Sequence, residues 1–188
     1  MCFSFEISLA TFFLSWYISF YLLQKNLTTQ QIHYIYVLLI YSSMQLADSI
    51  LWYNNMRRNN INYYVTSFMI PFILSLQVYY NLFIYNNIKN IYAKVFSIIV
   101  TLYIFYRFNG YSSSICDNKL SSPIWGSNEI KLWEILIFIG LVFYPTCGLG
   151  CITSLIFVFI AYMFLNGAYG SLWCAFANLI AVYYLLTF

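Results

Sequence analysis

Residues 32–52 read IHYIYVLLIYSSMQLADSILW, and this stretch decides the fold. About 20 mostly apolar residues in a row are enough to cross a bilayer core of about 30 Å as an α-helix. The run contains a single carboxylate, Asp48, well inside the apolar stretch. A charged side chain is costly within lipid and usually marks a functional or partner-binding position. The stretch therefore predicts a membrane-spanning helix with a candidate site at Asp48.

The composition of the whole chain agrees with a protein that faces lipid. Of its 188 residues, 63% are hydrophobic and 7% are charged, and the mean hydropathy is +0.76. A soluble domain of this length needs a polar exterior, which eight Lys or Arg and five Asp or Glu residues cannot supply. Soluble globular classes are therefore excluded. The lipid bilayer is the first expected partner, and nucleic acid is not an expected partner.

Further apolar runs predict an all-α fold, a polytopic transmembrane helical bundle of about seven spans that forms one domain over residues 1–188. We expect the spans at residues 4–23, 32–52, 61–84, 91–105, 130–144, 151–165 and 171–188, with a polar loop at 106–129. A barrel would show period-2 alternation, which these runs lack. Pro145, Gly148 and Gly150 separate the fifth span from the sixth. A re-entrant loop at that point is the alternative.

Basic residues predict the orientation. With seven crossings, five Lys or Arg residues share the N-terminal side and three lie on the other side. This excess favours a cytoplasmic N-terminus. No basic stretch precedes the first apolar run, so we expect that run to be retained and not removed as a signal peptide. The abundance of Asn, Ile and Tyr indicates an AT-rich genome, such as that of a protist or a large DNA virus. A host endomembrane or a viral membrane is the expected location.

Counting the crossings places polar and aromatic residues from four spans on one side of the membrane. The members of this expected polar layer are Cys2, Glu6, Gln45, Asp48, Trp52, Glu134, Trp173 and Cys174. At spacings of three and four, the second-span members share one helical face. The basic residues Arg57, Arg58 and Arg107 fall on the same side. Whether the layer converges laterally depends on the order of the helices.

Each member of the polar layer also has a structural interpretation. Asp48 and Gln45 can bond neighbouring helices, and Glu6 and Glu134 can interact with the dipoles of their own helices. The five cysteines, at positions 2, 116, 147, 151 and 174, show no zinc-binding spacing, so we predict no metal site. No cofactor is identified. Cys2 and Cys174 are expected to be reduced on a cytoplasmic face, or able to bond each other on a lumenal one.

Three short blocks carry a resemblance to a known group of proteins. They are Met1-Cys2-Phe3-Ser4 with Ser8, then residues 44–52, MQLADSILW, and then residues 171–177, SLWCAFA. The chain resembles small multipass membrane proteins of unknown function from bacteria, algae and giant DNA viruses. These open with Met-Cys-Phe/Trp-Ser and carry Gln-x-x-Glu-x-x-x-Trp and Ser-x-Trp-Cys motifs. The resemblance implies a multispan fold and a shared role for the matching Cys, Gln, Asp and Trp residues, with Asp48 in place of the usual Glu.

Three functions from different classes fit these observations. The first, which we favour, is a transporter or channel for a small solute, ion or proton, with Asp48 as relay or coordination site. The second is a structural or partner-binding protein whose polar layer locks helix packing. The third, which we do not favour, is a membrane-embedded enzyme that uses Cys2 or Cys174 as nucleophile or holds a Cys/Asp metal site, with Arg57 or Arg107 as the positive neighbour. A second copy of the chain is a further candidate partner.

Overall fold

The computed structural model describes the backbone of residues 4–117, 120–126, 130–145, 149–164 and 169–188. Within these ranges, the side chains of 115–117, 120–122, 149–150, 161, 164 and 169–175 are not described. The described chain forms seven helices and one short hairpin. The first five helical elements are α1 (Phe5–Leu23), α2 (Thr29–Tyr53), α3 (Asn60–Tyr64), η1 (Val65–Met69) and α4 (Ile70–Tyr79). They are followed by η2 (Tyr80–Tyr85), α5 (Ile91–Arg107), β1 (Ser113–Asp117), β2 (Leu120–Ile124), α6 (Leu132–Phe143), α7 (Leu149–Phe164) and α8 (Tyr169–Thr187).

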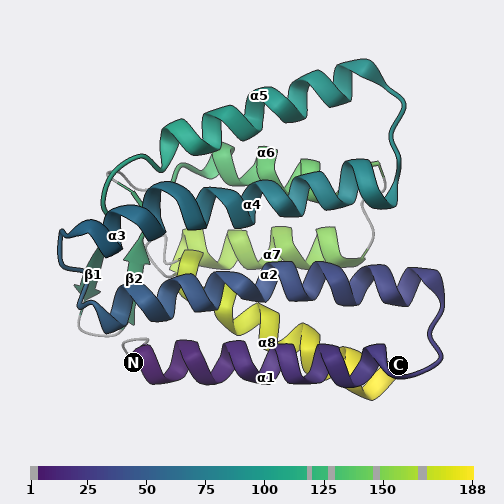
Figure 1. Cartoon of the computed structure of the whole chain (residues 1–188), viewed down its shortest axis with the longest axis horizontal. Coiled ribbons are helices and arrows are strands. Elements are labelled where there is room, and N and C mark those ends of the chain that lie inside the picture. Colours follow the sequence, from purple (N-terminus) through teal and green to yellow (C-terminus); the bar gives the residue numbers. More distant parts are fainter. Residues whose placement is uncertain (1–3, 118–119, 127–129, 146–148, 165–168) are drawn as a thin grey trace.

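The helices form an antiparallel bundle of two layers (Figure 1). Helices α5, α4, α2 and α1 lie side by side in one layer, and α6, α7 and α8 form the other. Contacts of α4 with α6, and of α1 and α2 with α8, join the layers. The N-terminal end of α1 lies beside the hairpin at one end of the bundle, and the C-terminal end of α8 lies at the opposite end. We call these the hairpin end and the C-terminal end.

Short polar side chains decide where several helices begin. The Ser4 hydroxyl accepts a hydrogen bond from the backbone N–H of Ile7. Thr28 and Gln31 bond each other reciprocally in a capping box. The Asn59 and Asn90 side chains each accept a bond from a backbone N–H of the first turn of the following helix. Such caps satisfy N–H groups that have no partner within the helix. The helices begin and end within three residues of the bounds of the expected spans.

Three of the described helices are long and apolar enough to cross a membrane. They are α1, α2 and the continuous helix Asn60–Tyr85, which comprises α3, η1, α4 and η2. Shorter apolar segments occur at Leu132–Val142, Cys151–Ile160 and Phe176–Thr187. The structure thus agrees with the expected helical membrane protein. That the chain crosses the membrane seven times remains a prediction.

The continuous helix is widened to π geometry on both sides of α4. Pro71 is the second residue of α4, directly after η1. Proline lacks a donor and its ring clashes with the preceding turn, and a wider turn relieves both problems. In η2, the side chain of Asn81 donates to the backbone carbonyls of Leu141 and Tyr144 at 3.2 and 2.7 Å. The π segment thereby joins the continuous helix to the end of α6.

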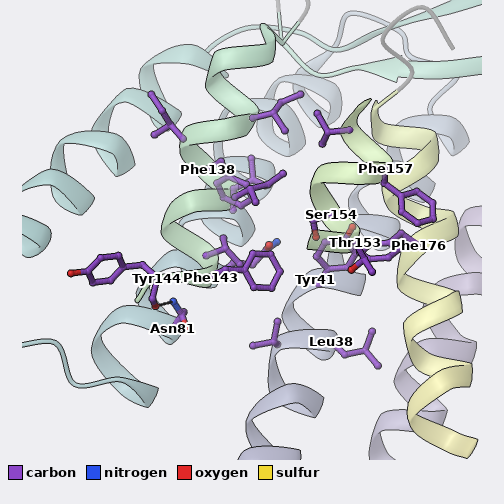
Figure 2. Close-up of a pocket in the computed structure, with 18 of the residues that line it drawn as sticks. Leu38, Tyr41, Asn81, Phe138, Phe143, Tyr144, Thr153, Ser154, Phe157 and Phe176 are labelled. Atoms are coloured by element: carbon purple, nitrogen blue, oxygen red, sulfur yellow. Dashed lines mark hydrogen bonds between the residues drawn. The ribbon is translucent and has the colours of Figure 1, made fainter. Parts of the chain in front are cut away.

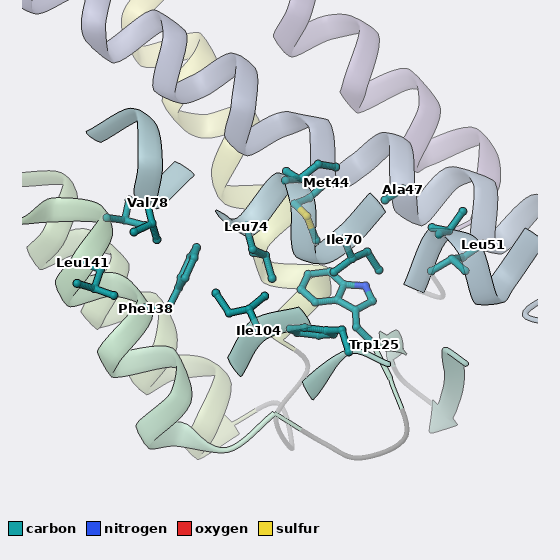
Figure 3. Close-up of a cluster of buried hydrophobic side chains, with 14 of the residues drawn as sticks. Met44, Ala47, Leu51, Ile70, Leu74, Val78, Ile104, Trp125, Phe138 and Leu141 are labelled. Atoms are coloured by element: carbon teal, nitrogen blue, oxygen red, sulfur yellow. The ribbon is translucent and has the colours of Figure 1, made fainter. Parts of the chain in front are cut away.

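The expected polar loop at 106–129 is partly wrong. Helix α5 continues through Arg107, and β1 and β2 then pair as an antiparallel hairpin in which Ser113 lies opposite Ile124. A chain segment packed against a bundle must pair its backbone polar groups, and strand pairing provides those partners. Immediately after β2, Trp125 enters the main hydrophobic core, where it is 4% exposed. It lies among Met44, Ile70, Leu74 and Ile104 (Figure 3).

Candidate functional site

Asp48 has a partner from the hairpin. The indole Nε1 of Trp125 donates a hydrogen bond of 2.8 Å to Oδ1 of Asp48. Asp48 is 1% exposed, so this bond is made in a nearly dry environment. A buried carboxylate without partners costs far more than a hydrogen-bonded one. The hairpin therefore supplies part of what Asp48 requires inside the bundle.

Gly126 fixes the path of the chain just after Trp125. Its φ of +84° is a conformation that side chains with a Cβ rarely adopt. A Cβ built at this position would meet the backbone oxygen of Arg107 at 3.4 Å. Glycine thus lets the chain turn closely over the end of α5 while the indole stays directed into the core.

A second polar cluster ties the hairpin to the start of the continuous helix. The backbone N–H of Ser112 donates to Asn62 Oδ1 at 2.8 Å, and Asn62 Nδ2 donates back to the Ser112 carbonyl at 2.9 Å. The hydroxyls of Thr66 and Ser112 lie 2.6 Å apart and share a hydrogen bond. All three residues are at most 1% exposed. The hairpin is therefore an integral part of the bundle at this end.

An ion pair joins α5 to α6 at the same end. The Nε of Arg107 lies 2.8 Å from Oε1 of Glu134, which also accepts a bond of 2.6 Å from the Tyr103 hydroxyl. Glu134 Oε2 accepts a bond from the backbone N–H of Lys131, as expected for an acid in the first turn of a helix. The two charged side chains are only 13% and 9% exposed. Each charge is thus compensated by its neighbour.

Five of the eight members of the expected polar layer have described side chains, and two of these, Asp48 and Glu134, belong to the clusters above. Gln45 is buried on α2 near Asp48, Trp52 is half-buried, and Glu6 is exposed in the first turn of α1. Arg57 and Arg58 are exposed in the turn after α2. Arg107 does have an acidic neighbour, namely Glu134. Cys2 and the side chains of Trp173 and Cys174 lie outside the described part of the chain.

Sequence reasoning missed Trp125, Tyr103, Asn62 and Thr66. The usable signal was an aromatic followed by glycine, Trp125-Gly126, within a segment that is otherwise polar. Among the described residues, no group of three His, Cys, Asp or Glu side chains could hold a metal ion. Cys151 is disulfide-bonded, which the spacing of the cysteines did not predict.

A cavity of about 830 Å³ lies between the two helical layers. In Figure 2, Phe138 and Phe143 of α6 lie across from Leu38 and Tyr41 of α2, with α7 and α8 alongside. The described lining extends from residues of the hairpin end, Arg107, Trp125 and Glu134, to residues of the C-terminal end, Gln30, His33, Tyr85, Asn86 and Phe188. The cavity thus follows the long axis of the bundle. Asp48 does not belong to its described lining, although its partner Trp125 does.

The cavity wall is mainly apolar and carries no unpaired formal charge among its described residues. Its charged members are Arg107 and Glu134, which pair with each other. The imidazole of His33 stacks on Tyr85 with ring centroids 3.4 Å apart and an interplanar angle of 9°. Nδ1 of His33 has no hydrogen-bond partner in the described structure, and both polar atoms of the buried Gln77 amide lack one. The wall therefore suits a neutral, largely apolar occupant.

Comparisons of the chain with protein-family models, with curated proteins and with solved structures find no match, so the family resemblance of the sequence stays a prediction.

Proposed function

We propose that this protein is a multispan membrane carrier that binds a small neutral amphiphile in the cavity between its helical layers. The observation that carries the proposal is the length and chemistry of that cavity, which extends toward both ends of the bundle and has a largely apolar wall. Ligand sites in proteins commonly enclose about 300–1,000 Å³. A cavity of about 830 Å³ has the size for such a ligand.

The outer surface of the bundle supports a membrane setting with seven crossings. Helix α5 alone exposes Ile91, Tyr92, Ile98, Leu102 and Tyr106, each by more than half of its surface. Apolar patches of this kind are unfavourable in water and match lipid chains. The helices alternate in direction (Figure 1), as seven crossings require. With 12 residues, or about 18 Å, α6 requires local thinning of the bilayer.

The neutrality of the cavity wall distinguishes between classes of solute. An ion that leaves water for an apolar cavity loses hydration worth tens of kcal/mol unless charges or many dipoles replace it. The Arg107–Glu134 pair compensates itself and offers no net charge. A neutral molecule meets no such penalty. We therefore favour a neutral solute over the ions and protons that the sequence left open.

The Asp48–Trp125 bond favours a second function, that of helix locking, for the polar layer. Asp48 is hydrogen-bonded by the hairpin and lies outside the described cavity wall. We propose that Asp48 holds α2 against the hairpin and does not contact the solute. Locking of helix packing was the structural role expected for the polar layer, and here it is assigned to Asp48 alone, within a solute-binding protein. The enzyme alternative rests on Cys2 and Cys174, so nothing described favours it.

Binding of matched probes to the full-length protein in lipid nanodiscs tests the proposal. Native mass spectrometry would compare tridecanol, a neutral amphiphile, with tridecylammonium, its cationic analogue. We expect saturable binding of tridecanol only. Val158→Phe places a ring in the cavity wall and should weaken tridecanol binding by roughly tenfold, which corresponds to about 1.4 kcal/mol.

Ile156→Phe is the matched control, because Ile156 lies on the same helix, is 52% exposed and is outside the described lining. This variant should bind tridecanol as the wild type does. The proposal is wrong if neither probe binds, or if both probes bind equally. Loss of tridecanol binding in a folded Asp48→Asn variant would instead indicate that Asp48 contacts the solute.

A further inference from the structure

The side-chain amide of Gln77 is the most unusual polar group of the cavity wall. Gln77 lies on α4, is 2% exposed, and belongs to the lining. Neither its Nε2 donor nor its Oε1 acceptor has a hydrogen-bond partner in the described structure. Most buried polar side-chain atoms in proteins are paired, and an unpaired one costs about 1–3 kcal/mol. A group of this kind in a cavity wall indicates a partner that binds there.

The neighbouring amide shows what a satisfied group looks like in this wall. Asn81, one helical turn from Gln77, also lines the cavity. Its Nδ2 donates to the carbonyl of Tyr144 (Figure 2) and to that of Leu141. Its Oδ1 accepts a bond of 2.9 Å from Asn86. Asn81 is thus occupied by the protein itself. Gln77 retains its NH2 group as donor and its carbonyl oxygen as acceptor for a ligand.

We propose that Gln77 anchors the polar head of the bound amphiphile, and that this head both donates and accepts a hydrogen bond. An alcohol fulfils this requirement, and so does a protonated carboxylic acid. An ether or an ester cannot, because it has acceptors alone. The apolar body then lies along the aromatic and aliphatic wall that includes Phe138, Phe143 and Phe157. This inference rests on the proposed function and adds the chemical class of the head group.

Two isomeric probes isolate the contribution of the donor. Tridecanol and dodecyl methyl ether have the same atoms and nearly the same length, but the ether lacks a hydroxyl donor. A net hydrogen bond is worth about 0.5–1.5 kcal/mol. We expect the wild-type protein in nanodiscs to bind the alcohol up to about tenfold more tightly than the ether. Native mass spectrometry over a range of probe concentrations gives both affinities.

Substitutions of Gln77 then test the anchor directly. Gln77→Leu and Gln77→Met keep much of the side-chain volume and remove the amide, so either variant should bind the two isomers equally. If Gln77→Leu fails to fold, Gln77→Met provides the same test. Ser75→Ala is the control, because its buried hydroxyl also lacks a partner among the described residues but does not belong to the described lining. This control should retain the preference for the alcohol.

The results separate the two proposals. If the wild type binds both isomers equally, the proposal that Gln77 anchors the head group is wrong, and water is then the partner of Gln77. The carrier proposal is unaffected by this result. A preference for the alcohol that survives in both Gln77 variants also overturns the anchor. If neither isomer binds, both the carrier proposal and the proposed anchor at Gln77 are wrong.

Discussion

At the scale of single residues, the contact between Asp48 and Trp125 helps to accommodate a carboxyl group inside this bundle. The indole provides a hydrogen-bond donor at 2.8 Å and an apolar body that fills the core around the carboxylate. A water molecule could supply the hydrogen-bond donor but not the apolar body. Trp125 is therefore suited to seal the hairpin end while it satisfies the acid.

Replacement of Trp125 by Phe tests this contact. The variant keeps an aromatic ring but removes the donor to Asp48, and hydrogen bonds to charged groups are worth about 1.5–3 kcal/mol. We expect the free energy of unfolding of the detergent-solubilised protein, measured by SDS titration, to fall by about that amount. Trp52→Phe is the control, since the Trp52 indole N–H has no partner among the described residues.

A double-mutant cycle sharpens the result. In an Asp48→Leu background, Trp125→Phe removes no hydrogen bond to Asp48, so its effect should be clearly smaller than in the wild type. Equal effects in both backgrounds would show that Trp125 acts through packing alone.

The sequence indicated one partner of this pair but not the other. Asp48 could be found because an acid inside an apolar run is rare. The pairing of Asp48 with Trp125 could not be found in this way, because Trp125 lies 77 residues further along the chain, in a segment without helical or strand periodicity. Contacts between distant residues depend on the order of the helices, which apolar runs do not determine. The same limit applies to the Arg107–Glu134 pair, whose members were both singled out but not joined.

At the scale of elements, the hairpin of β1 and β2 is held by side chains of the continuous helix. Asn62 and Thr66 lie one turn apart and both bond Ser112, which precedes β1. The two residues thus act as a single clamp on the hairpin. The helix bounds were predictable from apolar runs and polar caps, whereas the hairpin depends on this clamp, whose residues lie 46 and 50 positions from Ser112.

Thr66→Val tests the clamp, because valine has nearly the same shape but no hydroxyl. The change removes the bonds to the backbone N–H and the hydroxyl of Ser112, and we expect a loss of stability of about 1–3 kcal/mol. Amide hydrogen exchange in β1 and β2 should become faster at the same time. Thr11→Val is the control, since the partners of the Thr11 hydroxyl among the described residues are carbonyls of its own helix. Unchanged exchange in the hairpin would contradict the clamp.

At the scale of the whole molecule, the seven helices of the described chain alternate in direction, so the start of α1 and the end of α8 lie at opposite ends of the bundle. We predict that tags on the N- and C-termini are labelled from opposite sides of the membrane, with the N-terminus on the cytoplasmic side. A tag inserted between Arg57 and Arg58 should behave like the N-terminal tag. Membrane-impermeant labelling of sealed vesicles provides the measurement.

A tag placed after Pro145 separates seven crossings from a re-entrant pair. If α6 and α7 each cross the membrane, this tag is labelled from the side of the C-terminus. If the two helices enter and leave on one face, the tag is not labelled from that side, while both chain ends keep their positions. Labelling of both termini from one side would contradict the alternating bundle.

The separation of 77 residues between Asp48 and Trp125 has a consequence for biosynthesis. Helices inserted in chain order place α2 in the bilayer before the hairpin has been made. At about 5–20 residues per second, a ribosome needs roughly 4–15 s to reach the indole. Throughout that interval Asp48 does not yet have the hydrogen bond from Trp125, and α2 is not yet joined to the segment after β2 by this contact. Translation speed therefore sets how long α2 remains without this contact.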